Sequence, residues 1–129
     1  CASKSYLEAK GQPVTLEQLQ HHNCVLDSNF KMAKQWPFKH ISGAITQVSI
    51  TSNFSVNSPK AVQKAVLSGA GIGLIPDFII ENDLKASRLI PLLPDYQVMN
   101  FGLYAVYPHR KYLAQKIRCF IDYLSEFHA

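Results

Sequence analysis

Two short polar segments hold the side chains best suited to binding a small molecule. Ser28 and Asn29 follow an apolar run that ends at Asp27, and Asn57 and Ser58 stand between an expected strand and an expected helix. In open α/β sheets, ligands collect beyond the carboxyl ends of strands, where helix N-termini present free amides. A polar or anionic small molecule fits these positions. The alternative is structural, with Ser58 capping its helix and Asn29 forming a turn.

A second cluster, His21, His22 and Cys24, contains residue types that bind metals. Metal sites usually combine such a pair with a second group of ligands elsewhere in the chain. The sequence offers no second group, and Cys24 belongs to an apolar run that is expected to be a core strand. We therefore expect no metal here.

The glycine-rich run from Gly69 to Gly73 resembles a dinucleotide fingerprint in composition only. Such a fingerprint follows a strand and opens a helix, so that a phosphate meets the helix N-terminus. Here the glycines close an expected helix and open an expected strand. We expect Gly71 to provide a left-handed helix end and Gly73 to allow close backbone packing.

The residues give no positive case for catalysis. No serine lies in a Gly-x-Ser-x-Gly motif, and His40 and His109 have no recognisable partners. The carboxylates form no evident acid/base pair; they are Asp27, Asp77, Glu81, Asp83 and Asp95. The sequence thus predicts a binding domain without enzymatic activity or cofactor, and a small hydrolase is a minor alternative.

These segments are positioned by alternating helices and short apolar strands, which favours an α/β layer architecture. Helices are expected at 4–10, 15–22, 58–71, 78–85 and 110–127. The first has Ser3 or Ser5 as its N-cap, and Gly11 ends it. Strands are expected at 24–27, 45–50, 54–56, 72–75 and 101–107. Residues 28–42 are expected to be irregular because Pro37 removes a donor. Asp95 and Tyr96 are expected in a turn.

The expected last helix carries a continuous apolar stripe. Its members recur at spacings of four and three, as on one face of a helix; they are Leu113, Ile117, Phe120, Leu124 and Phe127. Such a stripe must pack against something.

The composition indicates one soluble globular domain. The 129 residues are 47% hydrophobic and 17% charged, with a formal net charge of +4. The basic residues are spread along the chain, so the charge does not indicate DNA contact. No apolar run approaches the ~20 residues of a membrane helix. No signal peptide is visible, and the missing initial methionine suggests a start inside a longer protein.

Three cysteines at wide spacings do not form a disulfide framework. We expect Cys24 and Cys119 to be small core residues of a protein in a reducing compartment, by default the cytoplasm.

Four motifs in order resemble the effector-binding domain of LysR-type bacterial transcription regulators, over essentially the whole chain. They are Cys1 to Leu7, Asn57 to Val62 followed by Gly69 to Phe78, Leu89 to Pro94, and Leu103 to Arg110. The resemblance implies an α/β fold like type 2 periplasmic binding proteins, in which two lobes are joined by two crossing strands and hold the effector between them. Each lobe is a Rossmann-like layered sheet with flanking helices.

The resemblance further implies that this chain is a single domain composed of two parts. The second lobe covers about residues 1–100, and the return strand and closing helix of the first lobe cover about residues 101–129. DNA would be bound only through an N-terminal helix-turn-helix outside this sequence. The closing helix would pack on the first lobe, fold back, or pair with another copy, so self-association as a homodimer or higher oligomer is expected, with no membrane contact.

By the same resemblance, the effector contacts of this lobe can be assigned to particular residues. They are Ser3, Ser28, Asn29, Phe30, Asn57, Ser58, Leu103 and Tyr104. The polar members would hydrogen-bond the effector, and Phe30 would wall the pocket. The main alternative function is a solute-binding protein of the same fold that feeds a transporter.

Overall fold

The computed structural model describes residues 1–30, 34–98 and 115–127. It divides into two compact units, Cys1–Met99 and Asn100–Ala129. The first unit holds every described strand, and the second holds one described helix. The expected strand at 101–107 lies outside the described residues.

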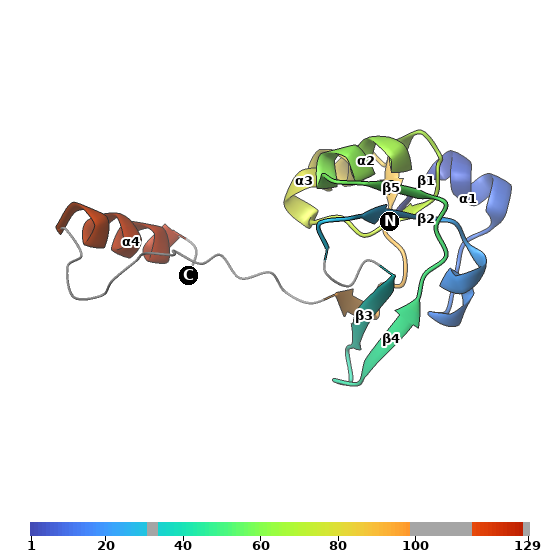
Figure 1. The fold of residues 1–129 in the computed structure, drawn as a ribbon, viewed down its shortest axis with the longest axis horizontal. Coiled ribbons are helices and arrows are strands. Elements are labelled where there is room, and N and C mark those ends of the chain that lie inside the picture. Colours follow the sequence, from blue (N-terminus) through green and yellow to red (C-terminus); the bar gives the residue numbers. More distant parts are fainter. Residues whose placement is uncertain (31–33, 99–114, 128–129) are drawn as a thin grey trace. The chain divides into compact units, whose positions relative to one another are not determined.

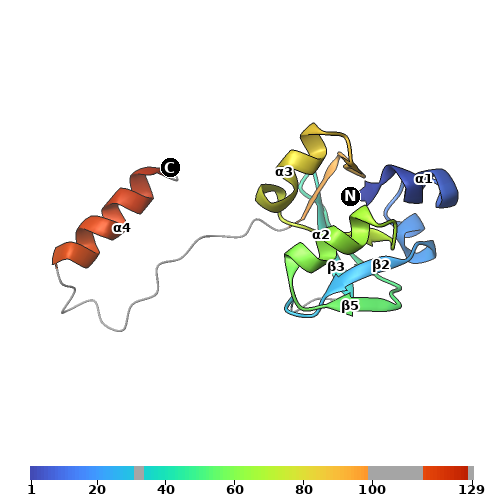
Figure 2. The same cartoon turned by 90° about the horizontal axis from the view of Figure 1, so that it is seen from above.

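A three-stranded parallel sheet forms the centre of the first unit. Its strands are β2 (Cys24–Asp27), β5 (Phe54–Val56) and β6 (Ile72–Gly73), in the order β5-β2-β6. Figure 2 shows β2 and β5 side by side and pointing the same way. Helices α2 (Pro59–Leu67) and α3 (Asp77–Lys85) follow β5 and β6. This strand–helix alternation confirms the α/β class that the sequence predicts.

Two smaller sheets complete the unit. β4 (Ile45–Ser49), β3 (Gln35–His40) and β8 (Tyr96–Val98) form an antiparallel sheet in the order β4-β3-β8. β1 (Ala2–Ser3) pairs antiparallel with β7 (Leu89–Ile90). Helix α1 (Lys4–Lys10) and the 3₁₀ helix η1 (Glu17–His21) lie between β1 and β2 in the chain.

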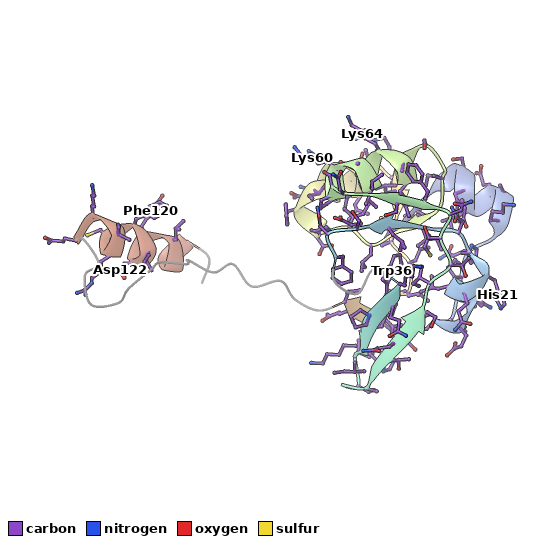
Figure 3. The ribbon with its side chains drawn as sticks, in the orientation of Figure 1. His21, Trp36, Lys60, Lys64, Phe120 and Asp122 are labelled. Atoms are coloured by element: carbon purple, nitrogen blue, oxygen red, sulfur yellow. The ribbon has the colours of Figure 1, made fainter. Side chains whose placement is uncertain are left out.

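Alternate residues of β2 point to opposite faces of the parallel sheet and so belong to two cores. Val25 packs with Val62 and Val66 of α2 on one face, where Figure 1 shows α2 and α3. Cys24 and Leu26 belong to the other core, which is shared with the antiparallel sheet; its largest members include Tyr6, Leu19, Trp36 and Phe38. Figure 3 shows Trp36 within this interior. The central strand is thus buried on both faces, as parallel strands usually are.

Strand β3 contradicts the expectation that residues 28–42 are irregular. The bonds from His40 N–H to the Ala44 carbonyl and from Ile50 N–H to the Lys34 carbonyl set the ladder between β3 and β4. Hydrogen-bonding positions alternate along a strand, so the nitrogen of Pro37, three residues from both Lys34 and His40, faces away from β4. On its other side, the described part of β8 ends opposite Phe38. Proline is therefore tolerated in the ladder with β4, because its nitrogen is not required to donate to that strand.

Two other short strands were also missed. β7 lies in a segment expected to be a loop, and Tyr96, expected in a turn, begins β8. Both pair with strands far away in sequence, so no local pattern indicates them.

The helix ends are partly as predicted. Ser3 caps α1 by accepting the Tyr6 N–H, and Gly11 ends it at φ 83°. The left-handed residue after α2 is Gly69, with φ 84°, rather than Gly71. Gly71 is instead required by space, since a Cβ there would lie 2.3 Å from the Asn23 carbonyl oxygen. Within residues 15–22 the helix is only the 3₁₀ helix Glu17–His21, and Gln18 accepts the N–H of Val14 instead of forming the expected capping box.

The described part of the second unit is helix α4 (Gln115–Phe127). It confirms most of the expected last helix, whose start at Arg110 lies outside the described residues. Ile117 and Phe120 are 43% and 60% exposed. Cys119 is exposed as well, so the expectation that it is a core residue is wrong within this unit. No helix among the described residues is long and apolar enough to cross a bilayer.

Candidate effector site

The carboxyl ends of β2 and β5 bring the two predicted polar segments together. Asp27, the last residue of β2, is in register with Val56, the last residue of β5. The N–H of Ser28 donates to the Val56 carbonyl at 2.7 Å. The ladder thus runs one step past the strands and fixes Ser28 beside the chain that leads to Asn57 and Ser58.

Asn29 links the two segments directly. Its Nδ2 donates to the Asn57 carbonyl oxygen at 2.6 Å, and its backbone N–H donates to Asp27 Oδ1 at 2.9 Å. The Phe30 N–H donates to the Asp27 carbonyl and closes a tight turn. Asn29 therefore has the turn role that the structural alternative assigns it, while its exposed side chain also spans the gap to β5.

Ser58 is the N-cap residue of α2 through its backbone alone. Its φ of −155° and ψ of 133° are extended, and its carbonyl accepts the N–H groups of Ala61 and Val62. The Ser58 side chain makes no capping hydrogen bond. Ser58 is half-buried and stands at this helix N-terminus, where anions are favoured.

Charged side chains are present at the same edge. Lys60, the second residue of α2, is exposed, and Figure 3 shows it with Lys64 on the outer side of that helix. Asp77 is the exposed first residue of α3. The edge therefore offers both signs of charge beside neutral hydrogen-bonding groups.

The remaining predicted contacts are placed differently. Phe30 is half-buried and packs against the core shared with the antiparallel sheet. Ser3 is only 4% exposed, and its Oγ accepts the Tyr6 N–H and lies 3.2 Å from Ser5 Oγ. It sits near Gly69, beyond the other end of the nine-residue α2, about 14 Å along the helix from Ser58. Leu103 and Tyr104 lie outside the described residues.

The histidine–cysteine cluster has structural partners. His22 Nδ1 and the Tyr6 hydroxyl are 3.1 Å apart, and burial lowers the pKa of His22. Cys24 is fully buried, and burial raises the pKa of its thiol to about 12, so it remains protonated. Within residues 1–30, 34–98 and 115–127, no group of three or more side chains is arranged to hold a metal ion.

Sequence reasoning missed the third segment at this edge. β6 is parallel to β2, with Val25 in register with Gly73, so the turn into α3 at Pro76 lies at the same edge. It leads into Phe78, which is 82% exposed. The signal was present in the sequence, since Pro76 stops an expected strand before an expected helix.

The chain matches one protein family over its whole length. The family described as LysR substrate binding domain covers residues 1–129. An HTH-type transcriptional regulator of Haemophilus influenzae is 33% identical over 116 residues, which are 90% of this chain and 40% of that protein. The HTH-type transcriptional regulator CrgA of Neisseria meningitidis is 30% identical over 97% of this chain and 42% of its own length.

Solved structures agree with this match. The full-length virulence activator AphB of Vibrio cholerae, a member of the LTTR family, aligns with a TM-score of 0.79 and 26% identity, over 99% of this chain and 43% of that one. The CrgA regulatory domain aligns with a TM-score of 0.71 and 30% identity, over 97% of this chain and 61% of that domain. The predicted likeness to a periplasmic-binding-protein lobe is confirmed.

The matches decide between the alternatives that the sequence left open. This chain spans about two fifths of the length of the curated regulators. The matched family is one of transcription regulators, not of enzymes, and a transporter-linked solute-binding protein is not favoured. LysR-type regulators bind small-molecule effectors and oligomerise. The chain belongs to the LysR substrate-binding domain family, the effector-binding domain of LysR-type transcription regulators.

Proposed function

We propose that this chain is the second lobe of a small-molecule sensor in a longer regulator, together with the return strand and closing helix of the first lobe. The supporting observation is the bond from Asn29 Nδ2 to the Asn57 carbonyl, which joins two loops at one sheet edge. That edge is where ligands collect in open α/β sheets. The whole protein would act in the cytoplasm as a homodimer or larger assembly, with DNA bound by a separate helix-turn-helix.

The effector in this proposal is polar or anionic. Ser28, Asn29 and Ser58 would provide hydrogen bonds, and Lys60 and the α2 amides would favour negative charge. Phe30 and Asn57 would form the floor between them. The described contacts of Ser3 support a helix-capping role, so we leave it out of this set.

The response would be a shift in population. An effector that binds one arrangement of the lobes or of the oligomer more tightly moves the equilibrium toward it. That shift would reach the DNA-binding domain only through differential affinity, not through contact between the effector and DNA.

The test is a thermal-shift screen of polar and anionic metabolites on the full-length protein, since a bound ligand raises the melting temperature by mass action. We expect Ser58→Ala to require about ten times more ligand for the same rise in melting temperature. It should lower the free energy of unfolding by less than ~1 kcal/mol, because the hydroxyl makes no capping hydrogen bond. Asn29→Ala should also weaken the ligand response.

Thr46→Ala is the matched control, because it removes an exposed hydroxyl from β4, which belongs to the antiparallel sheet rather than to the parallel sheet that carries the site. It should leave the ligand response unchanged. An unchanged response in both Ser58→Ala and Asn29→Ala would remove this edge from the effector site.

A further inference from the structure

Phe78 is more exposed than the other large hydrophobic side chains of the described residues, at 82%. It is the second residue of α3, whose Ile79 and Ile80 pack into the core below α2. A single exposed apolar side chain is common and proves nothing by itself. Its place in the fold is what makes it informative.

The topology puts Phe78 at the edge that holds the polar site. All three parallel strands end at this edge, and β6 lies next to β2 with Cys24 opposite Ile72 and Val25 opposite Gly73. Neighbouring strands are about 4.8 Å apart. The turn after β6 therefore stands one strand away from the turn that carries Ser28 and Asn29.

The start of α3 is held in place from below. Gln63 of α2 donates from Nε2 to the Ile79 carbonyl oxygen at 3.1 Å. Gln63 also bonds Asp83 one turn further along α3. The backbone that carries Phe78 is thus fixed relative to α2, whose N-terminus bears Ser58.

The surroundings of Phe78 fit a small molecule better than a protein interface. Asp77, which precedes it in the chain, and Ser28 and Asn29, which follow β2 at the same edge, are all exposed and polar. The core of a protein interface is instead a continuous apolar patch depleted of charge. An exposed ring at the same sheet edge as hydrogen-bonding groups suits a ligand that has one apolar side and one polar side.

We propose that Phe78 forms an apolar wall of the effector site, and that the effector carries an aromatic or other flat apolar group beside its polar or anionic group. The polar group would meet Asn29 and Ser58, and the flat group would pack on the Phe78 ring. Aromatic rings favour stacked or edge-to-face contacts of this kind. This inference rests on the proposed function, because it needs the effector to bind at this edge.

The experiment compares two probes that differ by one phenyl group, acetate and phenylacetate. Each is titrated at millimolar concentrations into the ¹⁵N-labelled 129-residue chain, and backbone amide shifts are followed by NMR. We expect both to shift the amides of Asn29 and Ser58, with phenylacetate binding about tenfold more tightly and also shifting Phe78. In Phe78→Ala that advantage should disappear, while acetate binding stays the same.

Ile41→Ala is the matched control, because Ile41 is also strongly exposed, at 72%, but lies in the turn between β3 and β4. It should keep the phenylacetate advantage. If Phe78→Ala keeps it too, or if phenylacetate binds no better than acetate, the inference is wrong although the polar site stands. If neither probe shifts the edge residues, the proposed site and this inference both fail. A Phe78→Ala variant whose only change is a faster diffusion coefficient would make Phe78 a contact between copies and would overturn the inference.

Discussion

Because Gly73 has no side chain, α2 can pack closely against the parallel sheet at this position. A Cβ at this position would lie 2.5 Å from Val66 Cγ2 and 3.1 Å from Val62 Cγ1. Both valines are fully buried and stiff at χ1, so they cannot turn aside cheaply. Close packing is thus found at Gly73, but against valine side chains; the close approach to another backbone is at Gly71, and the left-handed role expected of Gly71 belongs to Gly69.

We expect Gly73→Ala to lower the free energy of unfolding by about 1–3 kcal/mol through overpacking. Urea denaturation measures this value. The matched variant is Val66→Ala, which removes the nearer methyl. In that background the added cost of Gly73→Ala should fall clearly, since two residues in contact are coupled. An equal cost in both backgrounds would show that the clash is not the cause.

Among the helices and strands, those that the sequence predicted best have chemical signals at their own ends. Ser3 and Gly11 bound α1, and Ser58 with Pro59 begins α2. Strands β7 and β8 could not be found this way because their partners are distant in sequence. Strand β3 was missed because Pro37 argues locally against a strand, although its partner β4 follows directly in the chain. The polar edge could be predicted because polar residues directly follow expected strands in the chain. The exposure of Phe78 and the burial of Ser3 could not, because they depend on packing that no local pattern encodes.

Helices α2 and α3 are tied together by one buried carboxylate. Asp83 is 3% exposed and accepts hydrogen bonds from Gln63 of α2 and from Arg88 Nε at 2.8 Å, with Arg88 Nη2 at 2.7 Å. The hydrogen bonds from Gln63 and Arg88 lower the pKa of Asp83 below its ordinary 3.8. A lowered pKa means that the folded state prefers the ionised form, so this contribution is complete above pH 3.8 and is lost as the pH falls below it.

Asp83→Asn should therefore destabilise the protein at neutral pH by about 1–3 kcal/mol, because Asn keeps an acceptor but loses the charge that strengthens both bonds. The difference from the wild type should shrink as the pH is lowered through the pKa of Asp83. Thermal melts of both proteins along a pH series measure it. Glu81→Gln serves as control, since Glu81 lies exposed on α3 and pairs with Lys85 rather than with Gln63 or Arg88. A difference that stays constant down to acidic pH would mean that the charge of Asp83 is not responsible.

At the scale of the whole molecule, the question is what covers the apolar stripe of α4. Ile117 and Phe120 are three residues apart and thus lie on one helix face, and both are exposed within their own unit. The curated relatives are more than twice as long as this chain. Under the proposed function, the surface that would cover α4 would include residues outside this sequence. In the isolated chain, burial of apolar area favours pairing with a second copy.

We therefore expect the 129-residue chain to form dimers whose fraction rises with concentration in sedimentation velocity experiments. Phe120→Asp should shift the protein toward monomer, because a carboxylate cannot be buried in an apolar contact without a partner. Gln115→Asp adds the same single negative charge at an exposed α4 position on the opposite helix face and should leave the dimer in place. A wild-type chain that stays monomeric at every concentration would show that α4 packs onto its own chain. An equal effect of both substitutions would point to net charge, because a charge acts at long range from either face of α4. An effect through the apolar contact depends instead on which face carries the substitution.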